Sequence, residues 1–195
     1  MARTAQVERK TRETDLTVEV NLDGTGSYEG AVGVPFLEHM LELFAKHSLI
    51  DVAIGGSGDL PVDPHHTVED LGICLGQALD EALGDRAGIV RYGHTLCPME
   101  EVLATVALDF SGRPRLEWRV GPNGVIGGTY DSQLSEEFWE AVCRKAGLCL
   151  HVICEGGKNY HHIQEACFKG IAHAVRRAIE IDPRIRGVLS TKGTI

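Results

Sequence analysis

The stretch HHTVEDLGICLGQAL at residues 65–79 recurs, with substitutions, as HHIQEACFKGIAHAV at residues 161–175. Both copies begin His-His-x-x-Glu and continue as small and aliphatic residues at helical spacing. The recurrence predicts a duplicated chain. The repeated histidines and glutamates make a metal site the first functional hypothesis.

The first and fifth residues of each motif form a pair. Residues four apart lie on one face of a helix, so His65 lies beside Glu69, and His161 beside Glu165. An imidazole next to a carboxylate can bind one metal ion through two ligands. The alternative is that the histidines only line or cap the helices, which would fit a lone histidine better than two matched pairs.

The second histidine of each motif points elsewhere. Adjacent helical residues point about 100° apart, so His66 and His162 cannot easily bind the same ion as their neighbours. Each motif is therefore expected to serve two metal ions.

Composition limits the class of protein. The chain has 195 residues, of which 43% are hydrophobic, enough for one large domain or two small ones. Its net charge of -9 argues against nucleic-acid binding, which depends on clustered Lys and Arg. No apolar run approaches the roughly 20 residues that span a bilayer, and the polar start MARTAQVERKTRETD has no signal-peptide core, so no membrane association is expected.

The cysteines suggest a reducing compartment. They show no CxxC spacing, and several fall on apparently buried faces, so they are interpreted as reduced core residues of a cytoplasmic protein. The six are Cys74, Cys97, Cys143, Cys149, Cys154 and Cys167.

Aligning the two motifs also aligns what precedes them. A β-like region (7–30), a helix (35–47) and a strand (49–56) come before the first motif, in this order. The same order precedes the second motif, with a β-like region at 101–120, a helix at 132–147 and a strand at 148–157. The sequence therefore predicts an α/β chain of the α+β two-layer kind, built as a tandem duplication of a β-β-α-β-α unit.

Local signals set the expected boundaries. Asp23-Gly24 and Ser111-Gly112 are predicted as the turns of the two β regions. Asp63 with Pro64, and Asn159, are expected to cap the motif helices, and the last helix is expected to run to Asp182-Pro183. The segment LGDRAG predicts a boundary, giving halves 1–86 and 87–195 that together form one compact catalytic unit.

Five motifs in order now carry a family resemblance across nearly the whole chain. They are FLEHML, VDPHHTVEDLGICLG, DFSGRP, GKNYHHIQEACFK and STKG. Together they resemble the imidazoleglycerol-phosphate dehydratases of histidine biosynthesis. The duplicated halves are similar to that family's tandem fold, which is like the second domain of ribosomal protein S5.

The resemblance implies a metal centre and an assembly. It implies two Mn²⁺ ions per active site, a homo-oligomer of 24 subunits, and sites built between neighbouring subunits. It also implies seven metal ligands, which are His39, His65, His66, Glu69, His161, His162 and Glu165. The ligand types alone would also suit Fe, Co or Zn.

One ligand position departs from the commoner pattern. Where the family commonly has a His before two aromatic residues, this chain has Glu137 before Phe138 and Trp139. The internal alignment puts the counterpart of His39 within one residue of Glu137. Glu137 is therefore expected to be a metal ligand, and each ion is expected to bind one motif pair, one residue of the preceding helix, and a single His of the other repeat.

The resemblance also implies a phosphate-binding set. Its members are Arg91, Arg113, Lys169, Ser190 and Lys192. Lys169 follows Glu165 by four residues and faces the metal side of its helix, although it could equally form a simple Glu-Lys helix pair. Most exposed Lys and Arg residues are only solvated surface groups.

The implied reaction converts imidazole glycerol phosphate into imidazole acetol phosphate. The proton to be lost lies on a carbon with no adjacent carbonyl, so the imidazole ring must accept electrons. Two metal ions on the ring nitrogens would let the ring expel the hydroxyl and acidify the next C–H. Glu13 is expected to bind substrate and transfer the proton, with Glu69 and Glu165 as competing bases.

Two other functions remain as alternatives. A dinuclear metallohydrolase acting on a small phosphate ester would also use His and carboxylate ligands. A non-catalytic protein that assembles when metal binds would use them only to join subunits. RNA binding is disfavoured by the acidic balance.

Overall fold

The computed structural model describes residues 2–154 and 156–195. The first half contains six elements, which are β1 (Thr4–Lys10), β2 (Thr14–Asn21), β3 (Tyr28–Glu29), α1 (Pro35–Ser48), β4 (Asp51–Gly58) and α2 (His65–Leu83). Its sheet has the order β1-β2-β4-β3. β2 lies antiparallel to β1 and β4, while β3 pairs parallel to β4.

The second half repeats this plan. Its elements are β5 (Tyr92–Met99), β6 (Val102–Asp109), β7 (Arg115–Val120), β8 (Val125–Ile126), β9 (Tyr130–Asp131), α3 (Leu134–Ala146), β10 (Cys149–Cys154) and α4 (Tyr160–Ala178). The order β5-β6-β10-β7 reproduces the first sheet, including the parallel pairing of the last two strands. β8 and β9 form a separate small antiparallel pair. The expected α+β class and duplicated unit are confirmed.

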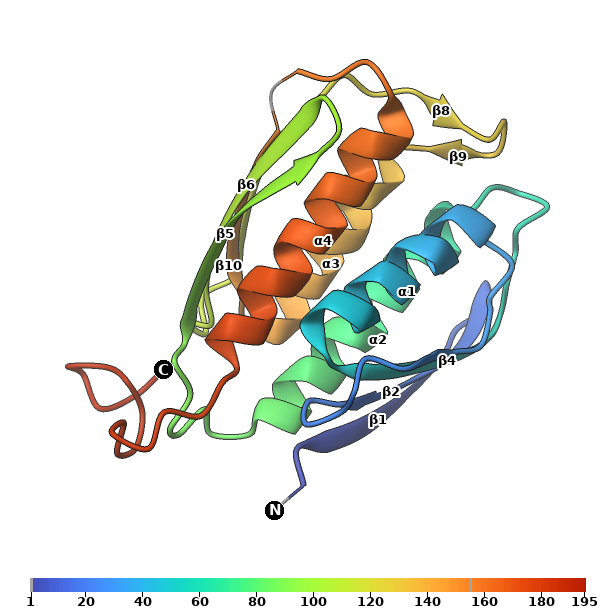
Figure 1. Ribbon diagram of the computed structural model, residues 1–195. Helices are drawn as coiled ribbons and strands as arrows, with labels where there is room; N and C mark the ends of the chain where they lie inside the picture. The colour runs from blue at the N-terminus through green and yellow to red at the C-terminus, as the bar shows by residue number, and fades with distance from the viewer. Residues whose placement is uncertain (1, 155) are drawn as a thin grey trace.

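Helices α1, α2, α3 and α4 lie between the two sheets (Figure 1). α1 and α2 are next to the first sheet, and α3 and α4 are next to the second. Aromatic rings fill the space where the helix pairs meet: Trp139 of α3 lies 5.7 Å from Phe44 of α1 and 5.2 Å from Phe168 of α4, between ring centroids. All three side chains are fully buried. The core is therefore shared by the two halves.

The turn predictions need correction. The Asp23-Gly24 turn ends β2 but leads to β3, which pairs with β4 and not with β2. Ser111-Gly112 likewise joins β6 to β7, two strands that are separated by β10. The real hairpins turn at residues 11–13 and 100–101, which contain neither Gly nor Pro. Leaving aside the β8–β9 pair of the second half, each unit thus has one strand more than predicted and reads β-β-β-α-β-α.

The end of the last helix also differs from the prediction. α4 ends at Ala178, four residues before Asp182. Beyond it, Ile181 bridges to Ile89, and the Asp182 amide donates to the Gly88 carbonyl at 2.9 Å. Backbone pairing to the segment before β5 therefore replaces the last helical turn. None of the helices in the described residues is long and apolar enough to cross a membrane.

Two glycines let α2 and α3 pack closely. A Cβ atom added at Gly72 would lie 2.6 Å from the carbonyl oxygen of Phe138, and one at Gly76 would lie 2.6 Å from that of Val142. Both distances are shorter than van der Waals contact, so only glycine fits without a shift of α3. The close approach brings the start of α2, where the first motif lies, beside α3.

We predict that Gly72→Ala destabilises the protein, although alanine favours helix by about 1 kcal/mol. Overpacking against α3 costs about 1 to 3 kcal/mol, so after the helix gain a net loss of up to about 2 kcal/mol is expected in the free energy of unfolding. Urea unfolding at a fixed protein concentration measures it. Gln77→Ala, an exposed change on the same helix, is the control. Equal stability of the two variants would contradict the packing argument.

Candidate metal centre and anion pocket

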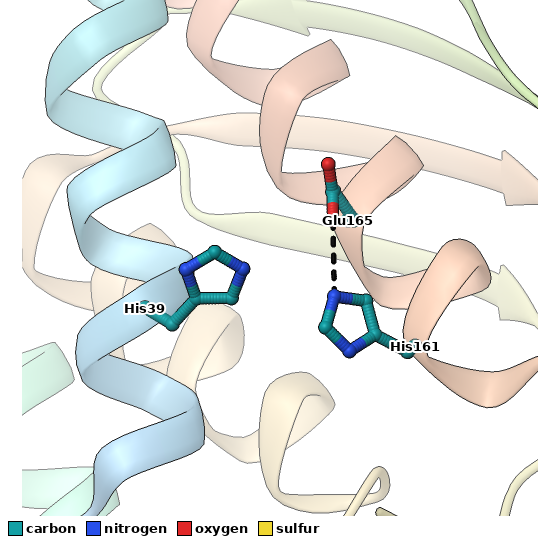
Figure 2. Close-up of side chains that lie close together, drawn as sticks. All are labelled: His39, His161 and Glu165. Atoms are coloured by element: carbon teal, nitrogen blue, oxygen red, sulfur yellow. Dashed lines mark hydrogen bonds and ion pairs between the residues drawn. The ribbon is translucent and has the colours of Figure 1, made fainter.

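Three expected ligands meet between α1 and α4. His39 comes from α1, and His161 and Glu165 come from the first turns of α4 (Figure 2). One ligand atom from each lies within 4.8 Å of the others. The His39 and His161 ring centroids are 5.5 Å apart, and His161 Nε2 lies 3.0 Å from Glu165 Oε2. The first repeat thus adds a histidine to the paired ligands of the second.

The start of α1 is fixed by a carboxylate beside His39. Glu38 Oε1 accepts hydrogen bonds from the backbone amides of Val32, Gly33 and Val34, at 2.8, 2.8 and 3.1 Å. These amides precede the helix, and a negative charge is also favourable at a helix N-terminus. Glu38 therefore anchors the loop and the turn that carries His39.

The start of α4 has the expected cap. Asn159 is the N-cap residue, and its Oδ1 accepts from the His161 amide at 3.0 Å. In α2 the N-cap position is Pro64, while Asp63 Oδ1 accepts from the His65 amide at 2.7 Å. Both motifs therefore open their helices, and a polar side chain fixes the first histidine's backbone in each case.

Glu165 is the buried member of the first cluster. Burial acts to raise the pKa of Glu165, but the hydrogen bonds and charges of Lys169 and His161 outweigh it, so the pKa lies below its ordinary value. Lys169 Nζ lies 2.5 Å from Glu165 Oε1. Glu165 is therefore ionised near neutral pH, as a ligand must be, and Lys169 makes the Glu-Lys helix pair.

A second group of expected ligands lies between α2 and α3. His65 and Glu137 line one pocket, together with residues of the β9 region such as Asp131. Glu69, one turn after His65, receives a hydrogen bond from Arg144 of α3 at 2.9 Å. The described structure therefore brings Glu137 to the same place as His65, while Glu69 is paired with an arginine.

Each of the two groups combines one helix of the first half with one helix of the second half. The first combines α1 of the first half with α4 of the second, and the second combines α3 of the second half with α2 of the first. His39 and Glu137 occupy matching helices, as do the two His-Glu pairs. The helices that carry the two groups are thus arranged alike, but of the six residues only His39, His161 and Glu165 bring ligand atoms within 4.8 Å of one another in the described structure.

The second histidine of each motif faces away from these groups. The rings of His65 and His66 are inclined by 84°, and those of His161 and His162 by 82°. His66 Nδ1 lies 3.0 Å from Asp59 Oδ2 and 3.9 Å from Glu13 Oε2. The hydrogen bond to Asp59 is the main cause that raises the pKa of His66.

His162 has a carboxylate partner of its own. Its Nδ1 lies 2.9 Å from Glu101 Oε2, at the turn between β5 and β6. This hydrogen bond is the main reason that the pKa of Glu101 falls to about 2. Sequence reasoning missed both Asp59 and Glu101, because acidic residues in turns are common and neither has a motif spacing to its histidine.

The predicted phosphate residues are divided by the structure. Four of them line one pocket at the C-terminal segment, namely Arg91, Arg113, Ser190 and Lys192. Lys169 is not among the lining residues, because it is paired with Glu165. Two further basic residues, Arg184 and Arg186, line the pocket and had no motif to mark them. The pocket is rich in positive charge and suits an anion.

Arg91 connects this pocket to the fold. Its Nε and Nη2 donate to Asp109 at 2.6 and 2.9 Å, and its Nη1 donates to the Leu189 carbonyl at 2.7 Å. The Asp109 carboxylate raises the pKa of the Arg91 guanidinium further. Arg91 therefore holds the C-terminal segment against β6, next to Ser190.

The donor set fits a divalent ion. Imidazole nitrogens and a carboxylate suit Mn, Fe, Co or Zn, and donors that share one ion at about 2.1 Å lie roughly 3 to 4 Å apart. One ligand atom each from His39, His161 and Glu165 lies within 4.8 Å of the others, so a small movement of the side chains would bring all three to one ion. A further group of the same spacing comprises Glu13, Asp59 and His66. Within the described residues, His66 and His162 do not join His39, His161 and Glu165, so that cluster has three candidate ligands from one chain.

Comparison with known proteins gives a consistent result. A family model described as imidazoleglycerol-phosphate dehydratase matches residues 32–175. The imidazoleglycerol-phosphate dehydratase of Moorella thermoacetica is 50% identical over 196 residues, covering 100% of this chain and 100% of the relative. That of Dinoroseobacter shibae is 52% identical over 195 residues, covering 99% of this chain and 100% of the relative.

Solved structures agree with the sequence relatives. The crystal structure of imidazoleglycerol-phosphate dehydratase from Staphylococcus aureus matches with a TM-score of 0.83 and 37% identity, covering 92% of this chain and 99% of the other. The Pyrococcus furiosus structure in complex with (S)-C348 also has a TM-score of 0.83, at 34% identity, covering 97% and 100%.

We predict that Glu38→Ala loosens the loop before α1. Three backbone amides lose a charged acceptor, so the free energy of unfolding is expected to fall by about 1.5 to 3 kcal/mol. Thermal and urea unfolding measure it. Glu42→Ala, one turn further along α1, removes an exposed carboxylate for which the described residues offer no hydrogen-bond partner, and serves as the control. If both variants are equally stable, Glu38 does not anchor the helix start.

Proposed function

The chain belongs to the imidazoleglycerol-phosphate dehydratase family, and from this premise we propose that its two His-Glu groups hold two Mn²⁺ ions per active site. The family is metal-dependent, and the enzyme is a hydro-lyase of histidine biosynthesis. It removes water from D-erythro-imidazole glycerol phosphate to give imidazole acetol phosphate. The observation that carries the metal proposal is the convergence of His39, His161 and Glu165. Because the chain belongs to this family, we set aside the two alternative functions, a dinuclear metallohydrolase and a metal-triggered assembly protein.

The ligands are divided between the two halves of the chain. We assign His39, His161 and Glu165 to one ion, and His65, Glu69 and Glu137 to the other. The duplicated geometry supports this pairing, because each set joins one helix of each half. Glu69 must leave Arg144 to bind the second ion.

The remaining two histidines bind ions of a neighbouring copy. His66 and His162 contact Asp59 and Glu101, away from the His39, His161 and Glu165 group, which supports their binding other ions. We propose that one subunit supplies His39, His161, His162 and Glu165 to an active site, and its neighbour supplies His65, His66, Glu69 and Glu137. Sites of this kind require a homo-oligomer, for which we propose 24 subunits.

The substrate's own chemistry sets what the residues must do. The hydroxyl leaves next to an imidazole ring, and the proton leaves from a carbon with no carbonyl beside it. Metal ions held by these residues would supply Lewis acidity, which would let the imidazole ring lose its proton near neutral pH and accept electrons. The ligand residues hold the ring in one orientation, so that the hydroxyl and the C–H lie in fixed positions.

Glu13 is the proposed group for substrate binding and proton transfer. Its carboxylate lies 3.9 Å from His66 Nδ1, and its side chain is about half exposed and accessible to a ligand. The competing bases have another proposed task, because Glu69 and Glu165 are both assigned as metal ligands. Thr14 and Asp70 support the turn that carries Glu13, since the Thr14 hydroxyl lies 2.5 Å from Asp70 Oδ2. We therefore assign the proton transfer to Glu13.

The basic pocket is the proposed phosphate site. Arg91, Arg113, Ser190 and Lys192 line it, and charge-assisted contacts of Arg or Lys with phosphate are strong. Lys169 does not line this pocket; we propose that it meets the substrate beside the metal group, where it contacts Glu165 from the next helical turn. The halves 1–86 and 87–195 thus act as one catalytic unit, and the six free, mostly buried cysteines support a location in the cytoplasm.

We predict that His161→Ala weakens Mn²⁺ binding by about 10-fold to 100-fold or more and abolishes formation of imidazole acetol phosphate. The reason is that one of three convergent ligands is lost. Metal content and product formation are measured on the same purified protein. His151→Ala, an exposed histidine on β10, is the control. Full metal occupancy and turnover in His161→Ala would overturn the ligand assignment.

Glu137 provides a second prediction. Glu137→His should retain both ions and activity, because imidazole can replace the carboxylate as a ligand. Glu137→Ala should lose about one of the two ions per site. The measurement is metal stoichiometry per subunit with turnover. Two tightly held ions and normal turnover in the Ala variant would make Glu137 a surface residue.

A further inference from the structure

The two β hairpins carry carboxylates at matching positions. β2 ends at Asn21, which pairs with Asp51, the first residue of β4, and β6 ends at Asp109, which pairs with Cys149, the first residue of β10. The offset from Asn21 to Asp109 is 88 residues (109 − 21), and the same offset takes Glu13 to Glu101. Glu13 and Glu101 are therefore equivalent residues of the duplication.

The equivalent carboxylates have different partners. Glu101 Oε2 lies 2.9 Å from His162 Nδ1, whereas Glu13 Oε2 lies 3.9 Å from His66 Nδ1. In the first half the carboxylate that accepts a hydrogen bond from His66 Nδ1 is instead that of Asp59, at 3.0 Å. Each second histidine thus has one close carboxylate on Nδ1, but the two halves supply it from different elements.

Glu101 also binds the backbone just before α4. Its Oε1 accepts from the backbone amides of Lys158 and Asn159, at 3.2 and 3.3 Å. Asn159 is the residue that caps α4. The two oxygens of one carboxylate therefore fix the histidine ring and the backbone that leads into the motif.

We propose that Glu101 is a positioning residue that orients His162 and fixes its tautomer, and that Asp59 has taken this task for His66, leaving Glu13 free to meet substrate. The carboxylate accepts hydrogen bonds only, so His162 must carry its proton on Nδ1 and present the Nε2 lone pair. A carboxylate behind a ligating imidazole also makes the ring more basic. The inference rests on the proposed role of His162 as a metal ligand.

Glu101→Gln distinguishes this role from shape alone. The amide has the same size, but only its oxygen accepts a hydrogen bond. If that oxygen serves the amides of Lys158 and Asn159, the NH₂ group faces His162 Nδ1, which must then give up its proton. The proton moves to Nε2 and blocks the ligand atom. Glu100→Gln changes the same charge at the neighbouring exposed residue and is the matched control.

The experiment titrates Mn²⁺ into the metal-free, full-length protein in competition with a chelating dye. We expect Glu101→Gln to weaken binding by about 10-fold to 100-fold, and Glu100→Gln to stay within about 2-fold of the unaltered protein. In a His162→Ala background, Glu101→Gln should add less than about 2-fold, because it acts through that ring. Turnover of Glu13→Gln should fall while its Mn²⁺ affinity stays unchanged.

Four outcomes would overturn the inference. They are unchanged binding in Glu101→Gln, an equal loss in Glu100→Gln, a full Glu101 effect that persists without His162, and loss of Mn²⁺ affinity in Glu13→Gln. The first two would leave Glu101 without a role or with a role through net charge only. The third would make it a loop residue. Unchanged Mn²⁺ binding in His162→Ala alone would instead contradict the proposed ligand set, so the two failures are distinguishable.

Discussion

The rotation of about 100° between adjacent helical residues is the constraint on which the metal centre depends. Because of it, the first histidine of each motif shares a face with the glutamate four residues later, and the second cannot. The rings of His161 and His162 are inclined by 82°, and those of His65 and His66 by 84°. A single helix start therefore presents ligands in two directions. The residues that each histidine meets in its own direction decide which ligand group it joins.

Packing of the helices between the two sheets brings these histidines to ligands from the other half of the chain. One direction leads inward, where a helix of the other half adds His39 or Glu137. The other leads to turn carboxylates, Asp59 for His66 and Glu101 for His162. Because of the duplication, each group of expected ligands joins one helix of each half, whereas the turns that contain Glu13 and Glu101 differ in their contacts. We interpret that divergence as the origin of the different tasks of Glu13 and Glu101.

Periodicity and repetition made the fold predictable. The helix expected at 35–47 is α1, Pro35–Ser48, and that expected at 132–147 is α3, Leu134–Ala146. The hairpins were placed wrongly because turn residues such as Asp23-Gly24 are local signals, whereas strand pairing is decided by which strands share the sheet. The short β3 had no pattern of its own, since two residues cannot show alternation.

The site residues were predictable where the ligands recur at a fixed spacing in the sequence. The His-Glu pairs are four residues apart, and His39 lies in a helix that the duplication matches with Glu137. Asp59, Glu101, Arg184 and Arg186 were not predicted, because tertiary structure alone brings them to the histidines and to the basic pocket. The pairing of Lys169 with Glu165 was one of two possibilities that the sequence left open.

Co-assembly of two inactive variants tests the central claim, that neighbouring subunits complete each site, most directly. His66→Ala and His161→Ala subunits are unfolded together, refolded at an equal ratio, and assayed for imidazole acetol phosphate. If one subunit supplies His161 and its neighbour supplies His66, about a quarter of the sites in a random mixture contain both residues, and a corresponding fraction of turnover returns. Mixed assemblies that remain as inactive as either variant alone would contradict the shared site.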